Sequence, residues 1–240
     1  MNALPKLETT LRSGLPFVYL NAAITADGKL APANRQFVPF TSKRDQDLLF
    51  ELRTRCDAVM AGARTVDSVP VNLGPGSKKY RDVRLKNGLS EYNLRVVVSG
   101  SGTLNPRAEI FRHQFSPLIV LVTERAEKNQ ITRLKNLGAI VEVCGEKAID
   151  FRLALRWLRS EWNVRRLLCE GGGEINAALI CEGLVDEVYL TLSPIVFGGR
   201  DAPTLADGPG LAKLASATRL KMKSSHRWRN EMFLTYSVMR

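Results

Sequence analysis

Hydrophobic residues along this chain gather in short continuous runs. Such runs occupy residues 17–24, 58–61, 96–98, 118–122 and 140–143. A strand that is buried on both faces carries apolar side chains at consecutive positions, whereas a half-exposed strand alternates them with polar ones. The five segments are therefore predicted to be strands of a mostly parallel sheet that helices cover on both sides.

Three helical stripes lie between or after these runs. Ser42 and Asp150 are predicted to cap the first two helices, and Gly183 is predicted to follow the third at its carboxyl end. Apolar side chains recur at helical spacing in each: Leu48, Leu49, Leu52 and Cys56; Phe151, Ala154, Leu155 and Leu158; Ile175, Ala178 and Leu179.

The last third of the chain has a different pattern. Residues 188–192 and 232–238 alternate apolar with polar or aromatic side chains, which indicates two antiparallel strands added at one edge of the sheet. Residues 69–94 are rich in Gly, Lys and Arg and are predicted to form a long loop of the kind that often covers a binding site. We expect one domain over residues 1–240, with residues 1–15 as a flexible extension.

Composition excludes several classes of protein. The 240 residues are 45% hydrophobic and 25% charged, which is typical of a folded globular chain and not of a disordered one. No apolar stretch reaches the roughly 20 residues of a membrane span, and the amino terminus lacks a signal peptide, so we expect a cytoplasmic protein. With only two histidines and no C-x-x-C pair, a zinc site is not expected; Cys56, Cys144, Cys169 and Cys181 are interpreted as reduced core residues.

The formal net charge of +11 has two interpretations. A basic enzyme attracts phosphorylated ligands, and a basic surface binds nucleic acid. The lysines and arginines are spread along the chain, and no nucleic-acid recognition motif accompanies them. A phosphorylated small molecule is therefore the favoured partner.

The strongest local motif is Glu-Gly-Gly-Gly-Glu-Ile at residues 170–175, where an apolar strand leads directly into a helix. Glycines allow the backbone to approach a phosphate, and a helix amino terminus offers free N–H groups. A tight strand-to-helix turn is the plainer explanation, but three consecutive glycines exceed what a turn needs. The spacing matches neither the dinucleotide fingerprint nor the P-loop.

Three further strand ends carry small or polar residues. They are Thr-Ala-Asp-Gly-Lys at residues 25–29, the Gly-Ala-Arg-Thr-Val-Asp run at residues 62–67, and Ser-Gly-Ser-Gly at residues 99–102. Each is an ordinary strand end when taken alone. In open α/β sheets, ligands bind at the carboxyl ends of strands, so these loops are candidates for one shared site.

In combination and in order, these motifs resemble the reductase family of riboflavin biosynthesis, over almost the whole chain. The marks are D-G-K at 27–29, Thr-Ser and Asp at 41–45, Leu-Arg at 52–53, D-A-V-x-x-G-x-x-T-V at 57–66, R-V-V-V-S at 95–99, E-G-G at 170–172, L-V-D-E at 184–187 and P-x-x-F-G-G at 194–199. The resemblance implies a dihydrofolate-reductase-like, three-layer α/β/α fold. It also implies NADPH as cofactor, a homodimer, and reduction of a pyrimidine ribosylamine 5′-phosphate to the ribitylamine.

The resemblance further implies a role for individual residues. Arg53 would pair with the substrate phosphate and Glu170 would bind the pyrimidine or ribose, although from pattern alone the first is equally a solvated arginine and the second a helix-terminal carboxylate. Asp67 is the candidate catalytic residue, orienting substrate or helping to deliver a proton. The residues implied for the cofactor are Ala23, Gly62, Thr65, Ser99, Gly100, Gly171, Gly172, Gly173, Glu174 and Ile175.

The sequence departs from the family pattern on the substrate side. Asp67-Ser68-Val69-Pro70 stands where the family often has Asp-Pro, and Pro39-Phe40 stands where many members have tryptophan. The cofactor assignment is thus the firmer one. Two alternatives stay open: a reductase of a pterin or other heterocycle on the same fold, and a non-catalytic nucleotide- or nucleic-acid-binding relative. The residues do not choose between a diamino and a deaminated pyrimidine.

Overall fold

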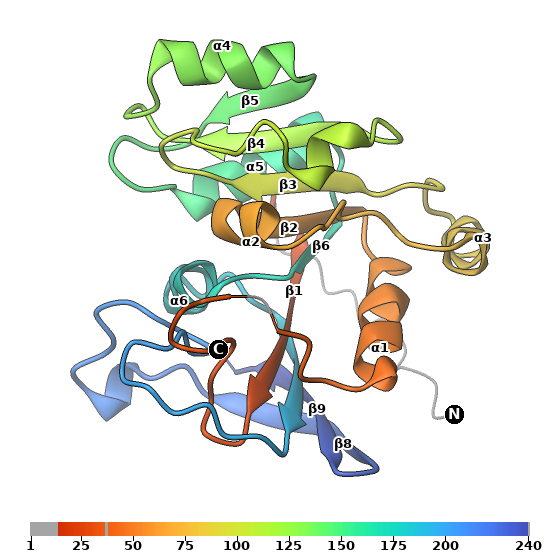
Figure 1. The fold of residues 1–240 in the computed structure, drawn as a ribbon, viewed down its shortest axis with the longest axis vertical. Coiled ribbons are helices and arrows are strands. Elements are labelled where there is room, and N and C mark those ends of the chain that lie inside the picture. The colour runs from red at the N-terminus through yellow and green to blue at the C-terminus, as the bar shows by residue number, and fades with distance from the viewer. Residues whose placement is uncertain (1–13, 37, 240) are drawn as a thin grey trace.

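The computed structural model describes residues 14–36 and 38–239, and most of the expected amino-terminal extension lies outside them. One sheet runs through the molecule in the order β5-β4-β3-β2-β6-β1-β7-β9-β8. Figure 1 shows this succession from β5 near the top to the β8–β9 hairpin at the bottom. The strands are β1 Phe17–Thr25, β2 Ala58–Gly62, β3 Leu94–Val98, β4 Leu118–Val122, β5 Ala139–Val143, β6 Arg166–Cys169, β7 Glu187–Ser193, β8 Leu220–Trp228 and β9 Glu231–Val238.

Helices cover both faces of the sheet. Side chains that alternate along β1 separate the two halves of the core: Val18 and Leu20 pack with helices α5 and α6, and Phe17 and Tyr19 pack with α1, α2 and α4. This gives the three-layer α/β/α arrangement that the pattern predicted. The helices are α1 Lys43–Arg53, α2 Ala63–Ser68, α3 Lys78–Lys86, α4 Lys128–Asn136, α5 Phe151–Glu161 and α6 Gly173–Cys181, with short 3-10 turns at Glu109–Arg112 and Leu214–Ser216.

The edges of the sheet differ from the sequence prediction. The run at 140–143 forms the edge strand β5, where Ile140 and Val143 are 38% and 43% exposed, so it is not buried on both faces. Strand β7 is parallel to β1 and antiparallel only to β9. The edge of the sheet is instead formed by β8, residues 220–228, which pairs with β9 in a hairpin. The basic composition of this segment concealed it from the sequence pattern.

Two segments that were predicted as loops contain helices. Residues 69–94 include α3, whose first turn begins after Ser77, and the loop after β2 is the short helix α2. Arg84 of α3 is almost fully buried and donates to the carbonyl oxygens of Arg53, Cys56 and Ser90. A long polar side chain therefore anchors α3, and a search for apolar periodicity does not detect such an anchor.

The predicted caps are confirmed with one difference. The Asp150 carboxylate accepts the backbone N–H of Leu153, and Gly183 follows α6 with a φ of +64°. Ser42 stands at the amino terminus of α1 but makes no side-chain cap there; its hydroxyl donates to Glu231 instead. Cys56, Cys144 and Cys169 are buried free thiols as predicted, whereas Cys181 is exposed.

Candidate active site

The strand ends singled out in the sequence meet at one edge of the sheet. Strands β1, β2, β3 and β6 are all parallel, so their carboxyl ends share an edge. A cavity of about 850 Å³ opens there, between the end of β1, helix α1 and the amino end of α6. Parallel topology thus places three of the four sequence motifs, at residues 62–67, 99–102 and 170–175, around one space, as expected for an open α/β sheet. The turn at residues 25–29, which was a candidate for the same site, is not part of the cavity lining.

The loop and helix start at residues 170–175, here called the glycine loop, form one wall of this cavity. Its three glycines are required for different reasons. Gly171 and Gly172 have φ values of +52° and +108°, which side-chain-bearing residues rarely adopt. A Cβ on Gly171 would lie 2.2 Å from Asn176 Oδ1, and one on Gly173 would lie 2.3 Å from Asp207 Oδ2. At Gly172 nothing lies within 4 Å of the added atom. Packing explains two of the glycines, and Gly172 leaves open space in front of the helix amino terminus.

The other residues implied for the cofactor also line the cavity. They are Ala23, Gly62, Thr65, Ser99, Gly100, Glu174 and Ile175, together with the three glycines. Gly62 donates its N–H to the Gly171 carbonyl at 3.3 Å, so the loops after β2 and β6 are held together. A Cβ at Gly62 would lie 3.1 Å from Ile175, which explains the glycine at this strand end.

The loops and the open Gly172 position fit an extended phosphorylated cofactor. A backbone-lined wall without side chains lets a diphosphate reach the free N–H groups at the start of the nine-residue helix α6. Ala23, Gly62 and Gly100, at the ends of three strands, have a small side chain or none, and this leaves room in the cavity for the nucleoside parts of such a cofactor. These residues would hold the cofactor by shape and by backbone donors.

Arg53 and Glu170 lie together, in an arrangement that the sequence did not predict. Arg53 Nε and Nη2 each donate to one oxygen of Glu170 at 2.6 Å, and Nη1 donates to the Gly74 carbonyl at 2.6 Å. The Arg53 side chain is only 5% exposed, and it is not among the cavity-lining residues, whereas Glu170 is. The solvated arginine considered as an alternative is therefore wrong. The role of Arg53 in binding the substrate phosphate stays a prediction. It requires the guanidinium either to break its ion pair with Glu170 or to bind the carboxylate and the phosphate together.

Asp67, the candidate catalytic residue, stands at the exposed end of α2 and lines the cavity. Its Oδ1 accepts the backbone N–H of Asn105 at 3.0 Å, which links α2 to the loop after β3. The structure thus brings Asp67 to the same cavity as Glu170 and the glycine loop. Its catalytic role is not tested by this geometry.

Several polar residues of the cavity were not assigned a role from the sequence, and three of them stand out. Asp45 lies in the first turn of α1, Asn21 in the middle of β1, and Arg35 in the loop that follows β1. Asn21 sits inside an apolar strand, which is a signal that sequence reasoning could have used. Arg35 reaches the cavity only because the loop between β1 and α1 folds back over the strand ends, and no pattern in the sequence predicts the path of that loop.

Several family motifs have a structural role. The Asp27 carboxylate accepts the backbone N–H groups of Phe197 and Gly198, so the D-G-K turn holds the P-x-x-F-G-G loop. Asp57 accepts from the N–H groups of Arg165 and Arg166 and sets β2 against β6. These carboxylates position strands and loops and do not reach the cavity.

Burial controls the chemistry of the thiols. It raises the pKa of Cys144 to about 11 and that of Cys169 to about 12, and it raises the pKa of the Cys56 thiol further. A protonated thiol is a poor nucleophile, so these cysteines serve packing. Among the described residues there is no group of three His, Cys, Asp or Glu that could hold a metal ion. None of the helices in residues 14–36 and 38–239 has the length and apolar character that a membrane span requires.

Comparisons with known proteins agree with this architecture. Residues 16–234 match the family model described as the RibD C-terminal domain. The 2,5-diamino-6-ribosylamino-4(3H)-pyrimidinone 5′-phosphate reductase of Methanothermobacter thermautotrophicus is 33% identical over 223 residues, covering 93% of this chain and 98% of the relative. The enzyme of the same name from Archaeoglobus fulgidus is 33% identical over 198 residues, covering 82% and 89%.

Solved structures show the same fold. Acinetobacter baumannii RibD superposes with a TM-score of 0.78 at 21% identity, covering 95% of this chain and 59% of that one. The riboflavin biosynthesis reductase Rib7 of Saccharomyces cerevisiae superposes with a TM-score of 0.70 at 18% identity, covering 96% and 93%. Fold and site thus define a reductase-type α/β protein with the dihydrofolate-reductase-like arrangement. The chain belongs to the RibD C-terminal domain family, the reductases of riboflavin biosynthesis.

Proposed function

We propose that this protein is the reductase that converts 2,5-diamino-6-ribosylamino-4(3H)-pyrimidinone 5′-phosphate to its ribitylamino product, with NADPH as cofactor. The observation that carries the proposal is the single cavity in which the glycine loop, Asp67 and Glu170 meet. The relative of this name from M. thermautotrophicus supports the substrate class, because the alignment covers 98% of its length.

The reaction reduces a C=N bond of the opened sugar. A bound dihydronicotinamide supplies the hydride to the sugar carbon, and the nitrogen gains a proton. The protein must hold two phosphorylated molecules with the reacting atoms in contact and exclude competing water. The glycine loop, residues 170–175, would hold the cofactor phosphates, and the small residues Ala23 and Gly62 would leave room for the nicotinamide ring.

On the substrate side, Glu170 is presented to the cavity by its pair with Arg53 and accepts hydrogen bonds from the sugar or the pyrimidine. Asp67 orients the substrate or passes a proton to the nitrogen through water. Arg35 is exposed at the cavity wall, and no ion pair is found for it within the described part of the chain, so it is a second candidate for the substrate phosphate beside Arg53.

The homodimer and the cytoplasmic location are parts of this proposal. The edge strand β8 exposes the side chains of Leu220, Met222 and Trp228 by 43%, 52% and 45% among its basic residues, and exposed apolar side chains favour association. Light scattering on the purified chain tests the dimer. Three buried free thiols are compatible with a reducing compartment.

The test is oxidation of NADPH, followed by its absorbance, with the diamino and the deaminated ribosylamino pyrimidine phosphates offered separately. Turnover of the diamino compound supports the proposal, and parallel assays with NADH test the cofactor. Binding of NADPH without turnover of either pyrimidine would contradict the proposed substrate and favour another heterocycle.

A further inference from the structure

Asp207, a carboxylate from the long segment between β7 and β8, lines the cavity beside the glycine loop. Its Oδ1 accepts the backbone N–H of Thr204 at 2.9 Å and the Thr204 hydroxyl at 2.7 Å. Its Oδ2 accepts no hydrogen bond from the described part of the chain, and the half-buried carboxylate forms no ion pair there. One oxygen is therefore fixed by the protein, and the other is left for a donor in the cavity.

The segment that carries this carboxylate, residues 202–207, is held from two sides. Leu30 donates its N–H to a carbonyl of the segment at 2.8 Å, and Lys29 pairs with it in an isolated β-bridge. A backbone N–H of the segment donates to the Gly173 carbonyl at 2.9 Å, and the buried Asn176 side chain donates to another of its carbonyls at 2.9 Å. These contacts fix the segment between the turn after β1 and the first turn of α6.

Gly173 makes room for the carboxylate. A Cβ at this position would lie 2.3 Å from Asp207 Oδ2 and 2.5 Å from the Thr204 carbonyl oxygen. The carboxylate thus packs against the side of the first turn of α6, and within residues 14–36 and 38–239 it accepts none of the backbone N–H groups of that turn. The helix amino terminus therefore stays available for a phosphate, with an acceptor beside it.

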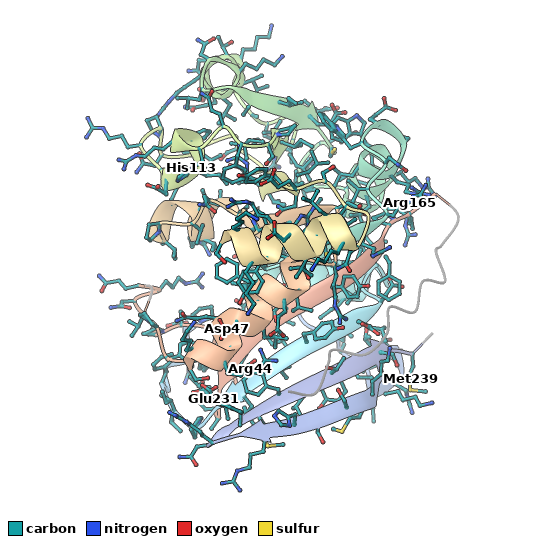
Figure 2. All side chains as sticks on the ribbon, turned by 90° about the vertical axis from the view of Figure 1, so that its right-hand side faces the viewer. Arg44, Asp47, His113, Arg165, Glu231 and Met239 are labelled. Atoms are coloured by element: carbon teal, nitrogen blue, oxygen red, sulfur yellow. The ribbon has the colours of Figure 1, made fainter. Side chains whose placement is uncertain are left out.

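Two carboxylates that hold loops in place use both of their oxygens for that purpose. Glu231, which Figure 2 labels beside the start of α1, accepts the backbone N–H and the hydroxyl of Ser42 with different oxygens. Asp27 likewise accepts from Phe197 with one oxygen and from Gly198 with the other. Asp207 differs from both, because only one of its oxygens is used within the protein and the residue lines the cavity.

The order of the strands assigns Asp207 to one half of the cofactor. In the proposed function the nicotinamide ring lies at Ala23 of β1, and the diphosphate lies at the glycine loop after β6. The loop at residues 99–100 follows β3, which lies on the other side of β6, beyond β2. An extended dinucleotide would therefore run from this loop across the glycine loop to β1. Asp207 is tied to the turn after β1 and so belongs to the nicotinamide side of the diphosphate.

We propose that Asp207 accepts a hydrogen bond from a hydroxyl of the nicotinamide ribose and thereby sets the direction in which the dinucleotide lies in the cavity. This inference rests on the cofactor named in the proposed function. It gives a role to a residue outside the motifs that the sequence analysis singled out.

The chemistry of the two riboses decides the direction. The nicotinamide ribose of NADPH carries two free hydroxyls, and a hydroxyl that donates to a carboxylate forms a charge-assisted hydrogen bond. Acidic side chains bind ribose hydroxyls in this way in other dinucleotide sites. The adenosine ribose carries a 2′-phosphate, which the negative charge of Asp207 would repel. A carboxylate at this place therefore favours the nicotinamide half and disfavours the adenosine half.

The plainer alternative is that Asp207 only closes the turn with Thr204 and stabilises the positive end of the α6 dipole. Asp207→Asn separates the two roles. The amide oxygen of asparagine can still accept from Thr204, so the turn is kept. The free oxygen is replaced by an N–H donor, so the acceptor for a ribose hydroxyl is lost.

The first experiment measures binding of NADPH and of adenosine 2′,5′-bisphosphate by isothermal titration calorimetry. Asp207→Asn is expected to weaken NADPH binding about tenfold, the size of effect of one hydrogen bond to a charged group. Binding of the bisphosphate should be unchanged, because it lacks the nicotinamide ribose. Asp201→Asn is the matched control, since Asp201 is exposed in the same connection and outside the cavity lining. Unchanged NADPH binding, or an equal loss for both ligands, would overturn the inference.

A second measurement covers the case in which Asp207→Asn does not fold, as judged by its urea transition. Thr204→Val removes one of the two donors that orient the carboxylate and is expected to weaken NADPH binding about threefold. An NADPH analogue that lacks both hydroxyls of the nicotinamide ribose should bind wild-type protein and either variant equally. A variant that still weakens binding of this analogue refutes the contact with the ribose.

These titrations contain no pyrimidine, so they separate the role of Asp207 from the proposed reaction. A loss of NADPH affinity confined to the intact nicotinamide ribose supports the inference even if neither pyrimidine phosphate is reduced. Turnover of the diamino compound together with unchanged NADPH affinity in Asp207→Asn refutes the inference and leaves the proposed function standing.

Discussion

Arg53 of α1 and Glu170 at the end of β6 form a bidentate pair, with both N···O distances at 2.6 Å. The residues are 117 positions apart in the sequence, and the pair joins the carboxyl end of α1 to the glycine loop. Since the guanidinium also donates to the Gly74 carbonyl, one side chain fixes three segments around the cavity. Glu170 is thereby held in one orientation at the cavity wall.

Arg53→Ala is expected to lower the free energy of unfolding by about 3 kcal/mol, because it leaves the Glu170 carboxylate nearly buried without its cation. Arg53→Lys should recover part of the loss, since an ammonium keeps the charge but not the fork. Urea unfolding measures both. A variant with unchanged unfolding and only a raised KM for the substrate would instead assign Arg53 to the phosphate, as the family resemblance implies.

Arg35→Ala tests the second candidate for the phosphate. We expect KM for the pyrimidine phosphate to rise about tenfold, because an exposed cation at the cavity wall contributes a charge-assisted contact. The urea midpoint should not change, because Arg35 is exposed. The NADPH affinity should not change either, because the proposed contact of Arg35 is with the pyrimidine phosphate and not with the cofactor. If raising the salt concentration weakens wild-type and variant binding equally, Arg35 does not contact the phosphate.

Gly172→Val is expected to abolish measurable NADPH binding in a protein that still folds. Valine at a φ of +108° carries about 1–3 kcal/mol of backbone strain, and its side chain occupies the open space before α6. Gly183→Val is the matched control: Gly183 follows the other end of the same helix at +64°, outside the cavity lining. Fluorescence titration with NADPH should separate the two variants, and equal affinities would remove the glycine loop from the site.

Asp67→Asn is expected to lower kcat about 100-fold with little change in stability, which is the size of effect that a positioned proton-transfer group has. The substitution removes the ionisable group but keeps an oxygen that can accept the N–H of Asn105. The pH profile of kcat gives the decisive readout, because its dependence on a carboxylate should vanish in the variant. An unaltered profile would mean that Asp67 only holds the Asn105 loop.

Asp45→Asn is expected to stabilise the protein at neutral pH. The pKa of Asp45 is raised in the folded state, so the folded protein binds the proton more tightly than the unfolded chain. The stabilising effect of that proton is present below the ordinary pKa of aspartate and is lost as the pH rises through the raised value. Asparagine does not ionise, so its advantage over the wild type should appear as the pH rises through this window. Urea midpoints at acidic and neutral pH measure the difference, and a variant that is less stable at both would contradict it.

The sequence alone determined the layers of the fold and most of the cofactor side. Continuous apolar runs predicted buried strands because a covered strand has no polar face, and the caps at Asp150 and Gly183 follow from local backbone chemistry. The glycine loop was also recognisable from local backbone chemistry, because Gly171 and Gly172 have positive φ angles that residues with side chains rarely adopt. Strand β5 was predicted to be buried on both faces although it is an edge strand, and strand β8 was not predicted at all. In both cases exposure at an edge of the sheet weakens the apolar pattern on which the prediction depends.

Only the tertiary structure decided how the polar residues are used. Arg53 and Asp45 lie eight positions apart on one helix, yet the first is neutralised by Glu170 and the second lines the cavity with no ion pair among residues 14–36 and 38–239. Charge and spacing do not distinguish them, because the free energy of a buried charge depends on which distant segment supplies its partner. The sequence determined which groups the chain has, and the parallel order of β1, β2, β3 and β6 decided which of them meet.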